Sequence, residues 1–71
     1  MKLLINGAER DLAQLQAGAT LAQALEALEL KADRIAVEHN GSILARANWP
    51  VTPLHDGDKL EIVQFVGGGC A

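Results

Sequence analysis

The sequence predicts an α+β protein in which one helix crosses one face of a small mixed sheet. Two Asn-Gly pairs, Asn6-Gly7 and Asn40-Gly41, each separate short aliphatic runs and so predict two β-hairpins. Between them lies the clearest helical pattern, residues 20–30, and an alternating segment, residues 59–66, follows the second hairpin. This order of elements predicts a roll whose first and last strands are neighbours at the centre of the sheet.

The opening strand is expected over residues 1–5, where alternating apolar residues predict one buried face. Both central positions of a type I′ turn need a positive φ, which Asn6 and Gly7 tolerate well. The chain should therefore return as a second strand over residues 8–12. A loop over residues 13–19 then leads to the helix.

The helix begins with a recognisable cap. Thr20 is a suitable N-cap, and Gln23, three residues later, completes a capping box. Apolar residues follow at i, i+3, i+4 and i+7 and give one stripe, made of Leu21, Ala24, Leu25 and Leu28. The helix is expected to end near Leu30.

The second hairpin is expected over residues 34–44, with its turn at Asn40-Gly41. A helical turn over residues 45–50, closed by Pro50, follows it. A polar turn around Gly57 then leads to the last strand, residues 59–66, which is predicted to lie beside the first.

Side-chain alternation places apolar residues on both faces of this last strand. If Leu60 and Ile62 face the core, then Val63 and Phe65 face outward, and Leu4 of the first strand does so too. Single exposed apolar residues are ordinary on protein surfaces. An apolar patch beside a C-terminal tail is better explained as a docking surface, so Leu4, Val63 and Phe65 are the predicted partner-docking residues.

The chain ends in three glycines followed by its single cysteine and one alanine, namely Gly67, Gly68, Gly69, Cys70 and Ala71. A glycine run has no Cβ atoms and can enter a narrow tunnel fully extended, at about 3.3 Å per residue. This suits a protein whose C-terminus must reach a buried active site on another protein, although a frayed terminus has the same composition. We therefore expect a folded domain, residues 1–66, and a flexible tail, residues 67–71.

Composition and charge argue against several classes of partner and location. The net charge is −3 with no basic stripe, so nucleic acid is not expected, and an acidic surface suits a partner with a basic docking face. One cysteine cannot form an internal disulfide, which fits a reducing compartment. No segment is long and apolar enough for a membrane span or a signal peptide, so a cytoplasmic location is expected.

An independent enzyme is not expected either. His39, His55 and Cys70 do not have the spacing of metal ligands, and both histidines are expected to be solvated turn residues. The sequence contains no phosphate-binding or nucleophile-elbow motif. A chain of 71 residues also lacks the bulk to enclose a substrate pocket.

Taken together, these segments resemble the ThiS family of sulfur carriers, ubiquitin-like β-grasp proteins of thiazole (thiamine) biosynthesis. The resemblance covers nearly the whole chain. Its most specific part is DGDKLEIVQFVGGG, and INGAER, ATLAQALEALEL, IAVEHNGSIL and RANW match more generally.

The resemblance implies a defined chemistry at Gly69. Gly67 and Gly68 would belong to the tail that enters the partner's active site. A ubiquitin-activating-like adenylyltransferase of the ThiF type would use ATP to adenylate the Gly69 carboxylate, with no cofactor bound by the carrier itself. Sulfur derived from a cysteine desulfurase would then replace the adenylate. The resulting thiocarboxylate would donate its sulfur to a thiazole synthase of the ThiG type.

The sequence departs from the family at its end, because Cys70 and Ala71 follow the last glycine and leave Gly69 in an amide bond. Three explanations stay open. A processing protease would remove the dipeptide, the dipeptide would leave the chain inactive, or the Cys70 thiol would attack the Gly69 carbonyl in an N-to-S shift.

Two kinds of alternative function also stay open. The same thiocarboxylate chemistry serves molybdopterin synthesis and sulfur incorporation into amino acids or secondary metabolites. A non-catalytic ubiquitin-like interaction module belongs to a different class, because it would not exchange pyrophosphate with an activating enzyme.

Overall fold

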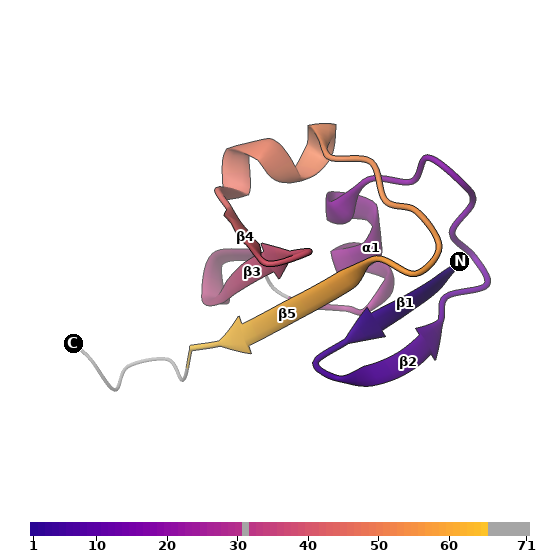
Figure 1. Cartoon of the computed structure of the whole chain (residues 1–71). Coiled ribbons are helices and arrows are strands. Elements are labelled where there is room, and N and C mark those ends of the chain that lie inside the picture. The colour runs from indigo at the N-terminus through magenta and orange to yellow at the C-terminus, as the bar shows by residue number, and fades with distance from the viewer. Residues whose placement is uncertain (31, 66–71) are drawn as a thin grey trace.

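The computed structural model describes residues 1–30 and 32–65, which form a five-stranded sheet packed against one helix. The strand order is β2-β1-β5-β3-β4, and Figure 1 shows β5 running through the middle of the molecule. The bounds are β1 Lys2–Ile5, β2 Ala8–Asp11, α1 Leu21–Ala27, β3 Ile35–His39, β4 Ser42–Leu44 and β5 Lys59–Gln64. Strands β1 and β5 are parallel and the other neighbouring pairs are antiparallel, which confirms the predicted roll.

Both Asn-Gly pairs form the predicted turns. The φ angle is 51° at Asn6 and at Asn40, 82° at Gly7 and 89° at Gly41. These are the left-handed values that a type I′ turn requires at both central positions. Each turn reverses the chain directly into its return strand and so fixes which side chains face the helix.

The helix α1 begins with the predicted capping box. The Thr20 hydroxyl accepts a hydrogen bond from the Gln23 N–H at 3.3 Å, and the Gln23 side chain accepts one from the Thr20 N–H at 2.8 Å. Leu21, Ala24 and Leu25 are buried as the stripe predicts. In the described part of the chain, no helix is long and apolar enough to cross a membrane.

The helix ends at Ala27 rather than near Leu30, so the predicted end was wrong by three residues. Glu29 adopts a left-handed φ of 59°, and its N–H donates to the Glu26 carbonyl at 3.0 Å. The N–H of Leu30 donates to the Leu25 carbonyl at 3.1 Å, which completes a Schellman motif. Glycine usually occupies the left-handed position of this motif, so a glutamate there is little indication that the helix ends.

The core lies between α1 and the face of the sheet that it crosses. Its buried residues are Leu3, Ile5, Leu12, Leu21, Ala24, Leu25, Ile35, Val37, Trp49, Leu54, Leu60 and Ile62. Trp49 lies in the 3₁₀ helix Arg46–Val51, where the sequence predicted a helical turn. Its indole N–H donates to the Leu44 carbonyl at 3.2 Å and fastens this helix to the end of β4.

The last strand, β5, is the central strand of the sheet. Phe65 follows it, and its N–H donates to the Arg34 carbonyl at 2.7 Å, which continues the pairing with the β3 side. Val66, which was predicted to belong to this strand, and the predicted tail, residues 67–71, lie outside the described residues.

Candidate functional site

The C-terminal end of β5 carries two of the predicted docking residues. Leu60 and Ile62 face the core and are 0% and 8% exposed. Alternation turns Val63 to the opposite face, which we call the outer face, where it is 57% exposed. Phe65, beyond the end of the strand, is 56% exposed. The predicted exposure of both residues is confirmed, and their role in docking stays a prediction.

Leu4 also lies on the outer face, but the register separates it from the other two docking residues. It pairs with Lys59 at the start of β5. Val63 comes four residues later, which corresponds to about 13 Å along a strand. Leu4 is also partly buried. The expectation that Leu4, Val63 and Phe65 form one apolar centre was therefore wrong for Leu4, because alternation defines the face of a residue but not its register.

Ala36 takes the place beside Val63 that the sequence had suggested for Leu4. It lies directly opposite Val63 in the β3–β5 ladder and is exposed. We call the outer-face residues Ala36 and Val63, together with Phe65 just beyond the end of β5, the outer-face patch. The sequence-based prediction did not include Ala36, although its position between the inward-facing Ile35 and Val37 would have placed it outward.

An acidic pair lies on the outer face next to this patch. Glu38 and Glu61 are directly opposite each other in the β3–β5 ladder, and like charges so placed are unfavourable. Ile43 of β4 lies opposite Glu38 and is 78% exposed. Counting residues across the turn at Asn40-Gly41 would have predicted the pairing of Glu38 with Ile43. The arrangement favours a partner that presents a cation beside an apolar surface.

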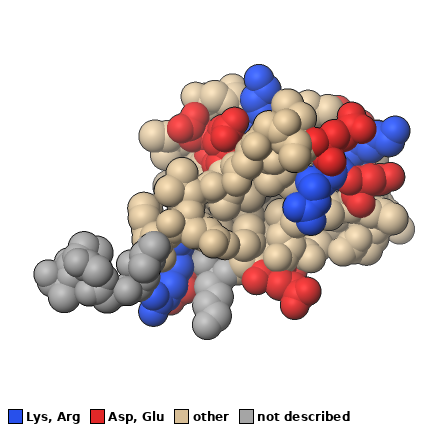
Figure 2. All heavy atoms as spheres, turned by 90° about the horizontal axis from the view of Figure 1, so that it is seen from below, with Lys and Arg blue, Asp and Glu red and all other residues tan. Residues whose placement is uncertain are grey.

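Charged side chains lie in small groups around the margin of the face shown in Figure 2, and uncharged surface fills the middle. The described residues on this face therefore form no continuous basic stripe of the kind that binds a phosphate backbone. The net charge of −3 agrees with this distribution. That nucleic acid is not a partner stays a prediction.

The acceptor and tail residues assigned from the sequence lie outside the described residues, and they are Gly67, Gly68, Gly69, Cys70 and Ala71. The structure describes the strand from which the chain reaches them. Strand β5 is paired with β1 on one edge and with β3 on the other. The roles of the glycines and of the terminal dipeptide stay predictions.

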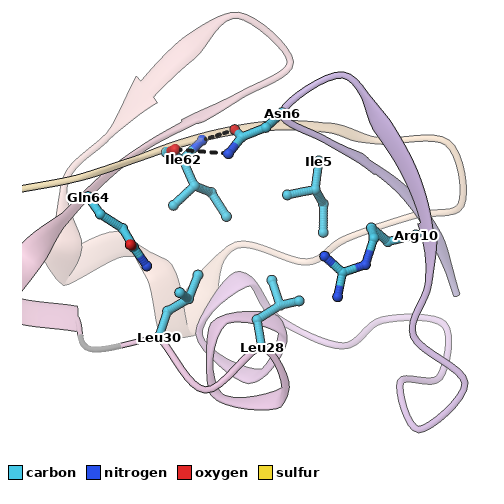
Figure 3. A pocket seen from close by; sticks show the side chains of 7 residues that line it. All are labelled: Ile5, Asn6, Arg10, Leu28, Leu30, Ile62 and Gln64. Carbon is cyan, nitrogen blue, oxygen red and sulfur yellow. Dashed lines mark hydrogen bonds between the residues drawn. The ribbon is translucent and has the colours of Figure 1, made fainter.

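An open groove of about 360 Å³ borders the end of β5 on the helix side (Figure 3). Its lining combines aliphatic side chains with one guanidinium and two carboxamides, from Ile5, Asn6, Arg10, Leu28, Leu30, Ile62 and Gln64. A smaller groove of about 210 Å³ lies nearby and is lined in part by Leu30, Ile35 and Phe65. The larger groove is lined by no carboxylate, thiol or imidazole of the described residues, so its chemistry suits contact rather than catalysis.

A cluster of polar residues joins the start of β5 to the second hairpin by hydrogen bonds. It lies at the opposite end of β5 from Phe65. The Asp58 carboxylate contacts His39 Nε2 at 2.9 Å and accepts hydrogen bonds from the His55 N–H at 3.0 Å and from Asn40 Nδ2 at 3.3 Å. The side chain of His39 is only 19% exposed, so the prediction of a solvated turn residue was wrong for His39. It is confirmed for His55, which is 73% exposed.

These contacts determine the pKa of Asp58. Burial acts to raise that pKa, and it is the largest single influence. The hydrogen bonds from His39, the His55 N–H and Asn40 act in the other direction, and with the Coulomb attraction of His39 they outweigh it. The pKa of Asp58 therefore lies below its ordinary value of 3.8. The ionised carboxylate stabilises the fold above that ordinary value, and the contribution is lost as pH falls through the lowered pKa.

Replacing Asp58 should therefore destabilise the protein in a pH-dependent way. Asp58→Ala removes three hydrogen bonds to a charged group and should lower the free energy of unfolding by about 2 kcal/mol near neutral pH. Urea unfolding at a series of pH values measures the difference, which should shrink below about pH 4. Asp56→Ala is the control, because Asp56 is exposed and accepts one hydrogen bond, from the Lys2 N–H. A difference that stays constant on acidification would contradict the assignment.

The order and direction of these strands define a class of protein. A mixed sheet with two parallel central strands, antiparallel hairpins at its edges and one helix across one face is a β-grasp fold, as found in ubiquitin-like proteins. The crystal structure of a thiamine biosynthesis protein (ThiS) from Geobacter metallireducens has the same fold. The two chains match with a TM-score of 0.81 and 33% identity over 97% of this chain and 100% of that one.

Residues 3–69 match the model of the ThiS family, and the chain belongs to that family. It is also similar to two longer relatives. The thiazole synthases of Paramagnetospirillum magneticum and Magnetococcus marinus are 42% and 33% identical to it over 69 residues. These matches cover 97% of this chain but 20% of either relative, so the chain spans about a fifth of their length.

Proposed function

We propose that this chain is a sulfur carrier in thiamine biosynthesis and that Gly69 is its acceptor residue. The observation that carries the proposal is that the match to the ThiS family runs through the three glycines and ends at residue 69. In this role the chain is a protein co-substrate of an ATP-dependent activating enzyme and is not itself a catalyst.

The chemistry follows from the weak reactivity of a carboxylate. A carboxylate oxygen of Gly69 attacks the α-phosphorus of ATP and pyrophosphate leaves, which converts the carboxylate into an electrophilic acyl adenylate. The terminal sulfur of a persulfide supplied by a cysteine desulfurase then displaces AMP at the carbonyl carbon and forms an acyl disulfide. A second thiol attacks the S–S bond of that acyl disulfide, which releases the thiocarboxylate and leaves a new disulfide between the two thiol sulfurs. The thiocarboxylate holds reduced sulfur in a nucleophilic form without releasing free sulfide. Because ATP belongs to the activating enzyme, the carrier needs no cofactor of its own.

The outer face is the proposed docking surface for the partners. The outer-face patch supplies the exposed apolar centre, and the acidic pair Glu38 and Glu61 supplies negative charge beside it. A ThiF-type adenylyltransferase and a ThiG-type thiazole synthase that use this surface would therefore present apolar side chains beside lysine or arginine. Two relatives named thiazole synthase contain a segment similar to this chain, which supports the synthase as a partner.

Cys70 follows Gly69 in the sequence, so the Gly69-Cys70 bond must be cleaved before this chemistry can begin. We propose that a processing protease cleaves the Gly69-Cys70 bond, because an ordinary peptide bond is all that such an enzyme requires. The thiol route needs Cys70 to act as a nucleophile and a base to ionise it. The two routes differ in whether Cys70 is required, and that difference is open to experiment.

The direct test is to reconstitute the two steps with the chain trimmed to Gly69. With ATP and the ThiF-type enzyme of the source organism, the trimmed chain should support ATP–pyrophosphate exchange. With a cysteine desulfurase and cysteine added, its mass should rise by the replacement of one oxygen by sulfur. A chain trimmed to Gly68 is the matched control and should be poor in both steps.

The alternatives give different results in the same assay. A non-catalytic ubiquitin-like module would show no exchange, which would contradict the proposal. A thiocarboxylate that forms but supplies no sulfur to the thiazole synthase would instead indicate a carrier for molybdopterin, an amino acid or a secondary metabolite.

A further inference from the structure

We propose that Asn6 is a positioning residue that fixes the direction in which β5 leaves the sheet, and so the direction from which Gly69 approaches the adenylating enzyme. The inference rests on the proposed function. It assigns to Asn6 a role in the reaction beyond its role in the first turn.

The Asn6 carboxamide binds both main-chain groups of one β5 residue (Figure 3). Its Oδ1 accepts a hydrogen bond from the Ile62 N–H at 2.7 Å, and its Nδ2 donates to the Ile62 carbonyl at 3.1 Å. The N–H of Asn6 also donates to the Leu60 carbonyl at 2.9 Å. The side chain thus replaces the peptide group of a neighbouring strand at the point where β1 ends.

These bonds matter because main-chain hydrogen bonding extends further along one edge of β5 than along the other. On the β3 edge, main-chain pairing continues to Phe65, whose N–H reaches the Arg34 carbonyl. On the β1 edge the chain turns away at Asn6, which has a left-handed φ of 51°. Among the described residues, the Asn6 carboxamide makes the last hydrogen bonds on that edge. Without them the end of β5 would belong to a two-stranded ribbon, which twists more strongly and more variably than an inner strand.

A type I′ turn alone does not require this side chain. Asparagine, aspartate and glycine all suit its first central position. Of these three, only asparagine carries a donor and an acceptor that can satisfy both groups of Ile62. Arg10 and Gln64 also line the groove, but neither side chain hydrogen-bonds to Ile62 in the described structure.

Asn40 provides a matched control within the same chain. It occupies the same position of the second Asn-Gly turn and has the same φ of 51°. Its Oδ1 accepts a hydrogen bond from the Lys59 N–H at 2.9 Å, at the start of β5 rather than near its end. Asn6→Gly and Asn40→Gly each leave a Gly-Gly turn and each remove side-chain bonds to β5, but only Asn6→Gly releases the end that leads to Gly69.

The test measures adenylation kinetics on chains trimmed to Gly69, which retain every described residue. With the ThiF-type enzyme of the source organism, Asn6→Gly should lower kcat by about tenfold, because fewer docked complexes hold the carboxylate at ATP. KM should change by less than about twofold, since the docking surface is retained. Asn40→Gly should change neither constant by more than about twofold. Hydrogen exchange should show loss of protection at the Ile62 amide in Asn6→Gly alone.

Asn6→Asp is a second variant that keeps the turn and the acceptor but places a carboxylate oxygen beside the Ile62 carbonyl. It should also lower kcat, and it replaces Asn6→Gly if that variant fails to fold. Three results would each overturn the positioning role. They are an equal loss of kcat in the Asn6 and Asn40 variants, an unchanged kcat in both Asn6 variants, and a rise in KM alone. An inert wild-type chain trimmed to Gly69 would overturn the proposed function and this inference together. An active trimmed wild type whose kcat is unchanged in both Asn6 variants would overturn this inference alone.

Discussion

The full-length chain should be inert in ATP–pyrophosphate exchange, and the chain trimmed to Gly69 should be active. In the full-length chain the Gly69 carbonyl belongs to an amide and offers no carboxylate oxygen to attack ATP. In a protein made of these 71 residues, the free carboxylate belongs to Ala71, which is at most about 7 Å further along the chain. Because a misplacement of about 1 Å can cost a factor of about 10², exchange by the full-length chain should fall to background. The measurement compares the two chains at equal concentration after their masses have been verified.

A third protein, full-length Cys70→Ser, identifies how the dipeptide is removed. After exposure to native cell extract it should become active if a protease cleaves the Gly69-Cys70 bond. It should stay inert if the Cys70 thiol acts, because a hydroxyl is a far weaker nucleophile near neutral pH. Exchange by untreated full-length protein of verified mass would contradict the masking role of the dipeptide.

Phe65→Ala should weaken binding to the adenylating enzyme by about 2 kcal/mol, or about 30-fold in Kd. Phe65 is the one phenylalanine of the chain and the aromatic member of the outer-face patch, and buried aromatic anchors dominate many interfaces. The thermal midpoint should change little, because the side chain is 56% exposed in the free protein. Calorimetric titration and thermal unfolding of the same samples give both quantities.

Val51→Ala is the matched control for this substitution. Val51 is an apolar residue with 73% exposure, but it lies in the 3₁₀ helix Arg46–Val51 rather than on β5. Its replacement should leave both the Kd and the thermal midpoint nearly unchanged. A large loss of stability in Phe65→Ala with an unchanged Kd would show that Phe65 serves the fold and not docking.

The features that could be predicted from the sequence are those with local signals. The two Asn-Gly turns require a backbone conformation that few residues adopt, so each hairpin was specified within a few residues. The capping box of Thr20 and Gln23 likewise lies within one helical turn. The burial of Leu60 and the exposure of Val63 follow from strand alternation alone.

The features that could not be predicted depend on contacts between distant segments or on unusual backbone. The Asn6–Ile62 hydrogen bonds join residues 56 positions apart. His39 contacts Asp58, which lies 19 positions later, just before β5, so its partial burial had no local signal. Leu4 was assigned to the correct face but the wrong neighbours, because the β1–β5 register is set by the whole core. The early end of the helix depends on a left-handed glutamate, which has no clear sequence signal.

The intact mass of this protein, purified from its native cells while they are starved of thiamine, tests the central claim most directly. A sulfur carrier with Gly69 as its acceptor should have lost Cys70 and Ala71, and a fraction of the molecules should carry one sulfur in place of one oxygen at the new C-terminus. Fragmentation should locate that sulfur on Gly69. Recovery of only the unprocessed chain, with no sulfur added under these conditions, would contradict the proposed function.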